Sequence, residues 1–195
     1  MEKLALPVIW TPNPGSQYCV LGGLQNVDDE YEIKEGISRI HGFPLDATFE
    51  MDRQFKKQVA LSDNLYNLER MAVISEGLKE FIEAKQPSNV EFLPVHISDH
   101  KGKRIKDAYH IMSPLAIVDC IDLKRSEIEW NELDPDAISD VLKLVLLPHA
   151  INSDLLLFRC KHFLGRIFVR PDLAAEIESH GFTGVQFTEL EDFIS

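Results

Sequence analysis

The residues best suited to metal or acid–base chemistry lie in one short segment, HISDH. It contains His96, Asp99 and His100, and His110 follows on the next predicted strand. Two histidines and a carboxylate are common zinc ligands. The segment lacks the spacing of known zinc motifs, however, and a histidine at the end of a strand is ordinarily hydrogen-bonded or solvated. We therefore expect no metal ion and no other cofactor here. A small metal- or histidine-dependent enzyme remains the alternative function.

A second pattern could supply a cysteine nucleophile. Cys160 ends an apolar run, and His162 lies two residues further along the chain. Thiolate catalysis needs a base opposite the thiol and a third group that orients the base, which this spacing alone does not provide. A cysteine in an apolar run, as Cys160 and Cys120 are, is more typical of a small buried side chain. The sequence also lacks a phosphate loop, a nucleophile elbow and a dinucleotide fingerprint. We predict no catalytic residue and a protein that is not an enzyme.

The most distinctive charge pattern is an acidic stretch around a tryptophan. No Lys or Arg occurs between Arg125 and Lys143, and Trp130 lies within this stretch. An aromatic side chain among carboxylates is suited to a cationic partner. The alternative is that Trp130 packs inward and the acids only face water. A second acidic segment, DDEYEIKE, covers residues 28–35. The predicted partner-binding residues are Glu127, Glu129, Trp130, Glu132, Asp134, Asp136, Asp28, Asp29 and Glu30.

Length and charge limit the classes of function. A chain of 195 residues with 45% apolar residues is predicted to form one domain, residues 1–195, with a strand- and loop-rich part at 1–60. The net charge of −12 disfavours nucleic acid and suits a basic protein partner, although it also serves solubility. Apolar runs are too short for a membrane helix. We expect a cytoplasmic protein without membrane contact.

Local patterns predict an α+β fold with mixed, mainly antiparallel sheets and two or more packed helices. Ser75 is a helix N-cap before an apolar stripe, and Pro171 begins a second helix that stops at Gly181. Predicted strands cover 91–97, 108–112, 115–121, 126–130, 141–147, 155–160, 165–170 and 184–187. The first two form a hairpin whose basic tip, 101–106, is interpreted as an exposed loop. Arg159 lies on an apolar strand and is expected to pair with a buried carboxylate, Asp119 or Asp122.

Several segments in this order resemble a known bacterial family. They are MAVISEGLKEF at 71–81, EFLPVHI at 91–97, IVDCIDLKRSEIEW at 117–130, LLLFR at 155–159, IFVRPDLAAEI at 167–177, and GFTGVQF at 181–187. Over residues 60–190 the chain is similar to immunity protein family eleven, which is associated with polymorphic-toxin and contact-dependent competition loci.

The resemblance implies a protein that binds one cognate toxin in the producer's cytosol and blocks it stoichiometrically, without a catalytic motif. An adaptor or structural binding domain without a toxin partner stays open as a further alternative. The identity and chemistry of the toxin and the oligomeric state do not follow from the sequence.

Overall fold

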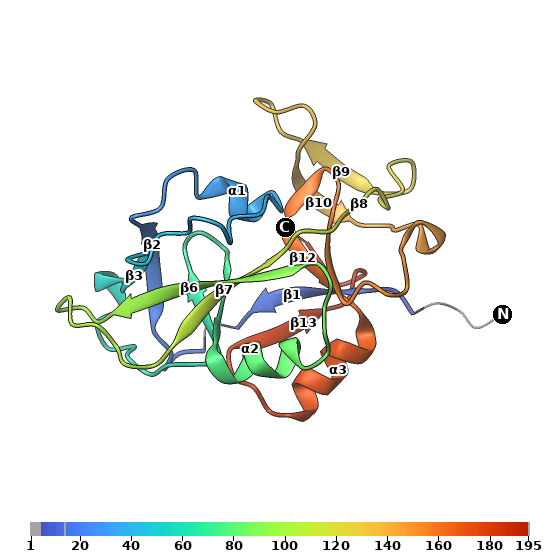
Figure 1. The fold of residues 1–195 in the computed structure, drawn as a ribbon. Helices are drawn as coiled ribbons and strands as arrows, with labels where there is room; N and C mark the ends of the chain where they lie inside the picture. Colours follow the sequence, from blue (N-terminus) through green and yellow to red (C-terminus); the bar gives the residue numbers. More distant parts are fainter. Residues whose placement is uncertain (1–4, 14, 195) are drawn as a thin grey trace.

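The computed structural model describes residues 5–13 and 15–194 of the chain. Within these residues, strands form a closed barrel, a five-stranded sheet beside it and a two-stranded hairpin (Figure 1). Figure 1 shows the hairpin on the side of the molecule away from the two longer helices. No helix in this part of the chain combines the length and the apolar character needed to cross a membrane.

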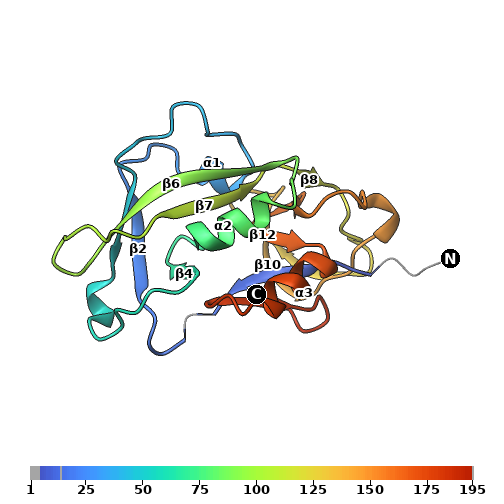
Figure 2. The ribbon, with the colours of Figure 1, turned by 60° about the horizontal axis from the view of Figure 1, so that its bottom comes forward.

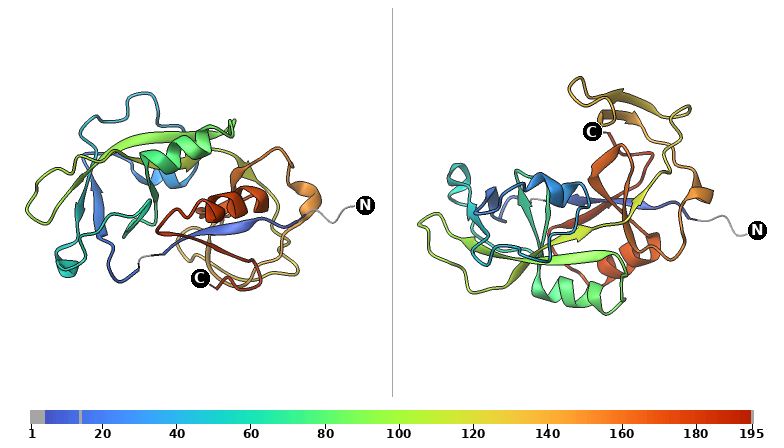
Figure 3. Two further views of the ribbon diagram at one scale, coloured as in Figure 1. Left: turned by 90° about the horizontal axis from the view of Figure 1, so that it is seen from below. Right: turned by 45° about the horizontal axis from the view of Figure 1, so that its top comes forward.

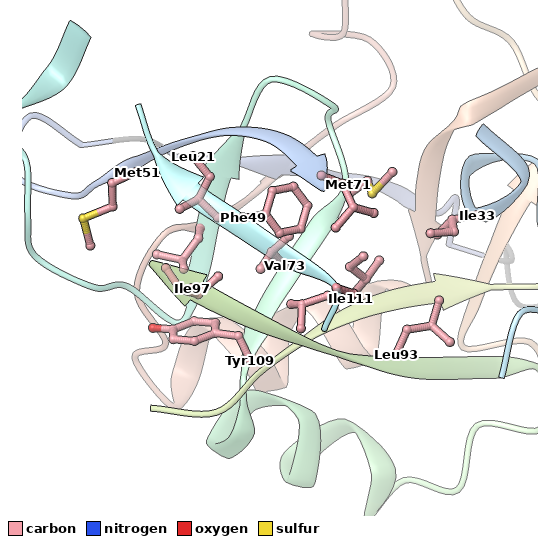
Figure 4. Close-up of a cluster of buried hydrophobic side chains, with 14 of the residues drawn as sticks. Leu21, Ile33, Phe49, Met51, Met71, Val73, Leu93, Ile97, Tyr109 and Ile111 are labelled. Atoms are coloured by element: carbon pink, nitrogen blue, oxygen red, sulfur yellow. The ribbon is translucent and has the colours of Figure 1, made fainter. Parts of the chain in front are cut away.

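The barrel is built from short strands that are far apart in the sequence. In order around the barrel they are β2 (Val20–Gln25), β3 (Thr48–Met51), β6 (Val90–Ser98), β7 (Tyr109–Pro114), β5 (Ala72–Ser75) and β4 (Asn64–Asn67). Neighbours pair antiparallel except at β2–β4 and β3–β6, which are parallel and close the ring. Inward side chains from every strand form one buried cluster, including Leu21, Phe49, Val73, Leu93 and Ile111 (Figure 4). Burying this apolar surface is the main stabilising contribution to the barrel.

The second sheet places the two ends of the chain side by side. Its order is β13 (Val185–Thr188), β1 (Val8–Pro12), β12 (Phe163–Val169), β11 (Leu157–Cys160) and β8 (Ile117–Val118). The β1 strand pairs antiparallel with both β12 and β13. The predicted hairpin of the two strands at 155–170 is confirmed, since Leu157 pairs with Val169.

Two helices cover apolar surface on the barrel and the sheet. Helix α2 (Glu76–Glu83) buries Leu78 and Ile82, and α3 (Pro171–Ser179) buries Leu173 and Ile177 in the same cluster (Figure 2). Ser75 caps α2 as predicted, because its hydroxyl accepts a hydrogen bond from Leu78 N at 3.3 Å. The remaining helical segments are one turn each: α1 (Tyr31–Lys34), η1 (Arg53–Phe55) and η2 (Pro148–Ala150).

The predicted hairpin around the basic loop is confirmed. Strands β6 and β7 pair antiparallel, and the basic residues of the tip, Lys101, Lys103, Arg104 and Lys106, are exposed. Pro94 pairs only across β7, because the contact of β6 with β3 begins at His96. Proline lacks a backbone N–H, so it is tolerated where the strand has a single neighbour.

The predicted α+β class is wrong. The protein is mainly β, and its helices are short covers rather than a packed layer. Capping and periodicity correctly located α2 and α3, but they carry no information on how many strands the helices cover. Barrel closure depends on parallel pairs such as Val20 with Tyr66 and Thr48 with His96, which have no local sequence signal.

Barrel and sheet are joined along a seam at Gly184. Asn64 of β4 donates from its backbone N to Thr183 O at 3.0 Å and from Nδ2 to Gly184 O at 2.9 Å. Gly184 O also accepts from Asn13 N at 3.0 Å. The backbone of Gly184 is left-handed, with φ +74, and it packs directly against β4. This seam therefore fixes the barrel against the sheet through buried, directional contacts.

Candidate functional site

The acidic stretch with Trp130 forms the projecting hairpin. Strands β9 (Glu127–Trp130) and β10 (Ile138–Lys143) pair antiparallel, and Ile138 and Val141 are buried in the apolar cluster below (Figure 3). Glu127 and Glu129 of β9 point to the opposite face, because side chains alternate along a strand, and the other predicted acids follow in the loop. The predicted acids of this stretch are all exposed: Glu127, Glu129, Glu132, Asp134 and Asp136.

The Trp130 side chain is partly exposed to solvent and contacts one other ring. It is 41% exposed, and its ring lies edge-on to the His162 ring at 5.5 Å between centroids. Leu133 and Leu142 on the same hairpin are 97% and 63% exposed. Exposed apolar side chains beside charged ones are typical of a surface that binds a protein. The predicted partner-binding residues of this stretch are therefore exposed, and two exposed leucines belong to the same hairpin.

Backbone hydrogen bonds hold the acidic loop in one conformation. Asn131 Oδ1 accepts from Leu133 N at 2.8 Å and from Asp134 N at 3.2 Å. His162 anchors the other side of the loop: its Nδ1 contacts Asp136 O at 2.7 Å, and its backbone O accepts from Ile138 N at 2.7 Å. A loop ordered before binding loses less entropy when a partner docks.

A groove of about 760 Å³ separates this loop from the second acidic segment. Asp134, Asp136 and Ala137 line one side, and Tyr31 and Glu35 line the other. The groove is not uniformly negative, since four cations also line it: Lys34, Arg70, Lys161 and Arg166. The sequence analysis missed these cations, because they come from segments that are distant in the chain.

The acids of the second segment lie at the edge of this groove. Asp28 and Asp29 are exposed and Glu30 is half-buried, directly before the groove residue Tyr31. Burial raises the pKa of Glu30, and the nearby carboxylate of Glu69 raises it further. The two predicted acidic segments therefore flank one groove, although the acids at 28–30 do not line it themselves.

Residues 24–192 match the model of the immunity protein family Imm11. The chain belongs to this family. Comparison with curated proteins gives no match. The matched range covers the barrel except for most of β2, both longer helices and the acidic hairpin. It extends further toward the N-terminus than the resemblance over residues 60–190. Membership in Imm11 indicates a role in protection against a toxin.

In this Imm11 protein His96, His100 and His110 each contact a different part of the chain. His96 Nε2 contacts Leu45 O at 2.9 Å, and His100 Nε2 contacts Asp52 O at 3.1 Å. His110 lies elsewhere, with Nδ1 3.4 Å from Glu76 Oε2 but without hydrogen-bond geometry. Among residues 5–13 and 15–194, no three His, Cys, Asp or Glu side chains are grouped as metal ligands. The alternative of an enzyme built on these histidines therefore has no geometric support.

His110 should instead make folding stability depend on pH. Burial lowers its pKa below the ordinary 6.5; the charge of Lys79 acts the same way, and those of Glu76 and Glu83 oppose it. The unfolded chain then binds the proton more readily, so stability falls as pH drops below about 6.5. We expect His110→Gln to flatten this part of the profile, measured as urea midpoints between about pH 7.5 and about pH 5. The exposed His41, changed to Gln, is the matched control. If both variants keep the wild-type slope, His110 is not responsible.

Cys160 is not placed as a nucleophile. It is fully buried, its Sγ lies 3.4 Å from Cys120 Sγ, and burial raises its pKa well above the ordinary value. The histidine two residues on, His162, contacts the acidic loop instead of the thiol. Both cysteines pack in the apolar cluster beneath the hairpin, as their sequence context predicted.

The expected partner of Arg159 is wrong. Asp119 pairs with Lys161 at 2.9 Å, and Asp122 pairs with Arg125 at 2.5 Å. Arg159 is 3% exposed and donates to three backbone oxygens: Pro114 O at 3.1 Å, Leu164 O at 2.6 Å and Ile33 O at 3.1 Å. Burial without a carboxylate lowers its pKa to about 10. Backbone carbonyl oxygens, and not a carboxylate, accept the hydrogen bonds of this buried guanidinium. No sequence pattern shows which of the two kinds of acceptor a buried arginine will have.

Proposed function

We propose that the protein neutralises one cognate toxin in the cytosol of the producing cell by stoichiometric contact through the acidic hairpin. The observation that carries this proposal is a hairpin whose predicted acids are exposed and whose Trp130 is 41% exposed, beside a groove of about 760 Å³. Membership in Imm11 supports a toxin as the partner. The net charge of −12 favours a basic toxin surface.

The contact has two physical parts. Carboxylates at the rim attract a basic surface over distances up to about one Debye length, roughly 8 Å at physiological salt, and so accelerate association. Trp130, Leu133 and Leu142 are exposed apolar side chains of the same hairpin. Those that the toxin covers are desolvated on docking, and this slows dissociation. The acids at 28–30 extend the negative rim on the far side of the groove. No catalytic step is required for inhibition of this kind.

Charge reversal at two places on the surface tests whether the hairpin itself attracts the toxin or whether only the net charge of the protein matters. We expect Glu129→Lys with Glu132→Lys to slow association with the product of the adjacent toxin gene about tenfold at low salt. The matched control is Glu80→Lys with Glu178→Lys, which changes the net charge equally on the exposed faces of α2 and α3 (Figures 1 and 3). Association rates are measured by stopped flow at several ionic strengths. Equal slowing in both variants would reject the hairpin as the contact.

Protection itself decides between an antitoxin and an adaptor. Co-expression with the adjacent toxin gene should restore growth, and the two products should co-purify in a fixed stoichiometry. Trp130→Ala should raise the dissociation rate roughly 30-fold, the effect of a typical aromatic anchor. A protein that binds another partner but leaves the toxin active is an adaptor, and the proposal then fails.

A further inference from the structure

A second, smaller cavity lies in the seam between barrel and sheet. It has a volume of about 200 Å³, and its lining comes from β1, β4, β5 and β12 and from the turn between β4 and β5. We call it the seam pocket and define it by Trp10, Asn64, Tyr66, Arg70, Arg166 and Ile167. None of its lining residues is acidic. Arg70 and Arg166 also line the larger groove, so they separate the two spaces.

Two side chains of the seam pocket carry buried polar atoms without a partner in residues 5–13 and 15–194. They are Trp10 Nε1, a donor, and Asn64 Oδ1, an acceptor, in residues that are 5% and 1% exposed. The hydrogen bond from Asn64 Nδ2 to Gly184 O fixes which end of the amide is left over. A buried polar group without a hydrogen bond costs about 1–3 kcal/mol. Both residues line the seam pocket, although these two atoms themselves are covered by protein.

The two arginines are unusual in so acidic a chain. In the part that the structure describes, neither guanidinium makes an ion pair or a hydrogen bond, whereas Lys34 and Lys161 of the same groove pair with Glu69 and Asp119. Arg166 lies against two aromatic rings, with its guanidinium carbon 5.9 Å from the Phe163 centroid and 5.5 Å from that of Phe193. These rings hold the guanidinium in place and cannot neutralise it.

The charges of the two arginines act on each other. Burial lowers the pKa of Arg166, and the charge of Arg70 lowers it further. Two like charges that line one pocket, without a counter-ion among the described residues, are relieved by an anion that binds between them. A guanidinium matches the flat, two-oxygen edge of a carboxylate or phosphate better than it matches a single atom.

We propose that the seam pocket binds a small oxyanion, a carboxylate or a phosphate, between Arg70 and Arg166. Trp10 and Asn64 line the same pocket, so a ligand bound to the arginines lies beside them. The volume of about 200 Å³ is below the roughly 300 Å³ at which pockets for larger ligands begin, so the ligand is small. It is either a free molecule or an acidic side chain that a partner inserts through the groove.

Trp10 provides a direct signal for binding. The chain has two tryptophans, so Trp130→Phe leaves Trp10 as the only one. The full-length variant is titrated with malonate and, separately, with inorganic phosphate, and sodium chloride at matched ionic strength serves as the blank. We expect a saturable change in Trp10 fluorescence and a higher Tm with at least one of the two anions. Which of them binds identifies the chemistry of the ligand, carboxylate or phosphate.

Arginine variants test whether the two guanidiniums hold the anion. Arg70→Gln should weaken binding about tenfold or more, because a charge-assisted contact is lost. Arg70 is exposed, so this variant should fold. Arg166→Lys keeps the charge but loses the two-pronged geometry, and it should also weaken binding. Lys124→Gln, which removes an exposed charge outside the seam pocket, is the control and should bind as the parent does.

The source of the anion follows from a second measurement on the wild-type complex with the adjacent toxin. Displacement of the toxin by the binding anion identifies an acidic side chain of the partner, and an unchanged complex identifies a free small molecule. Either result supports the pocket. No saturable response to either anion, or equal binding by Arg70→Gln and Lys124→Gln, would overturn it. These titrations use the protein alone, so they can fail while toxin neutralisation stands.

Discussion

Gly184→Ala is expected to lower the free energy of unfolding by roughly 3–5 kcal/mol. A Cβ at this position would lie 2.2 Å from Asn64 O, 2.6 Å from Ser62 Oγ and 2.9 Å from Ser62 Cβ. The first of these atoms is backbone and cannot rotate away. The added atom must therefore push β4 away from the sheet and break the two hydrogen bonds that Asn64 makes across the seam.

Gly181→Ala is the matched control for this variant. Gly181 has the same φ, +74, but a Cβ there meets no atom within 4 Å. It bears only the backbone cost of a left-handed residue, about 1 kcal/mol. Urea unfolding should give a much lower midpoint for Gly184→Ala than for Gly181→Ala at an unchanged m-value. Similar midpoints would show that β4 and the sheet move apart at the seam without a loss of stability.

Arg159→Met is expected to cost roughly 3–5 kcal/mol, because the carbonyls that the guanidinium satisfied stay buried. Pro114 O and Leu164 O lose the side-chain donor, whereas Ile33 O keeps a hydrogen bond from Ser113 Oγ at 3.0 Å. Arg159 thus connects the end of β7, strand β12 and helix α1. Its loss should also loosen the α1 segment beside the groove.

Two further variants keep the Arg159 result interpretable. Arg159→Lys retains the charge but not the three-way donor geometry, so its stability should fall between those of wild type and Arg159→Met. Arg125→Met removes an arginine of an exposed ion pair with Asp122 and should cost less than about 1 kcal/mol. Chemical unfolding measures all three. A loss below about 1 kcal/mol for Arg159→Met would mean that the carbonyls find other partners.

Local features of the fold were predictable because their causes are local. A serine before an apolar stripe predicted α2, Pro171 predicted the start of α3, and the alternation in 126–130 predicted β9. The barrel was not predictable, because its closing strand pairs join segments with no distinguishing pattern. The fold class was predicted as α+β because two helices were recognised correctly. A helix cap identifies a helix, but it does not show how many strands surround that helix.

The candidate site was partly predictable. The acidic stretch and Trp130 were selected from composition alone, and their side chains are exposed. The groove, its cations and the anchoring role of His162 were not found, because each depends on residues brought together only by the fold. His162 in particular was considered as a possible base for Cys160, and no sequence pattern links it to Asp136, which precedes it by 26 residues.

The position of β1 affects how the protein is made. Its hydrogen-bonded neighbours, β12 and β13, lie near the opposite end of the chain. During synthesis β1 is therefore made long before the two strands that pair with it. Contacts between such distant segments also slow folding. A nascent chain that stops before β12 and β13 are made would leave both edges of β1 unpaired, and unpaired strand edges favour aggregation.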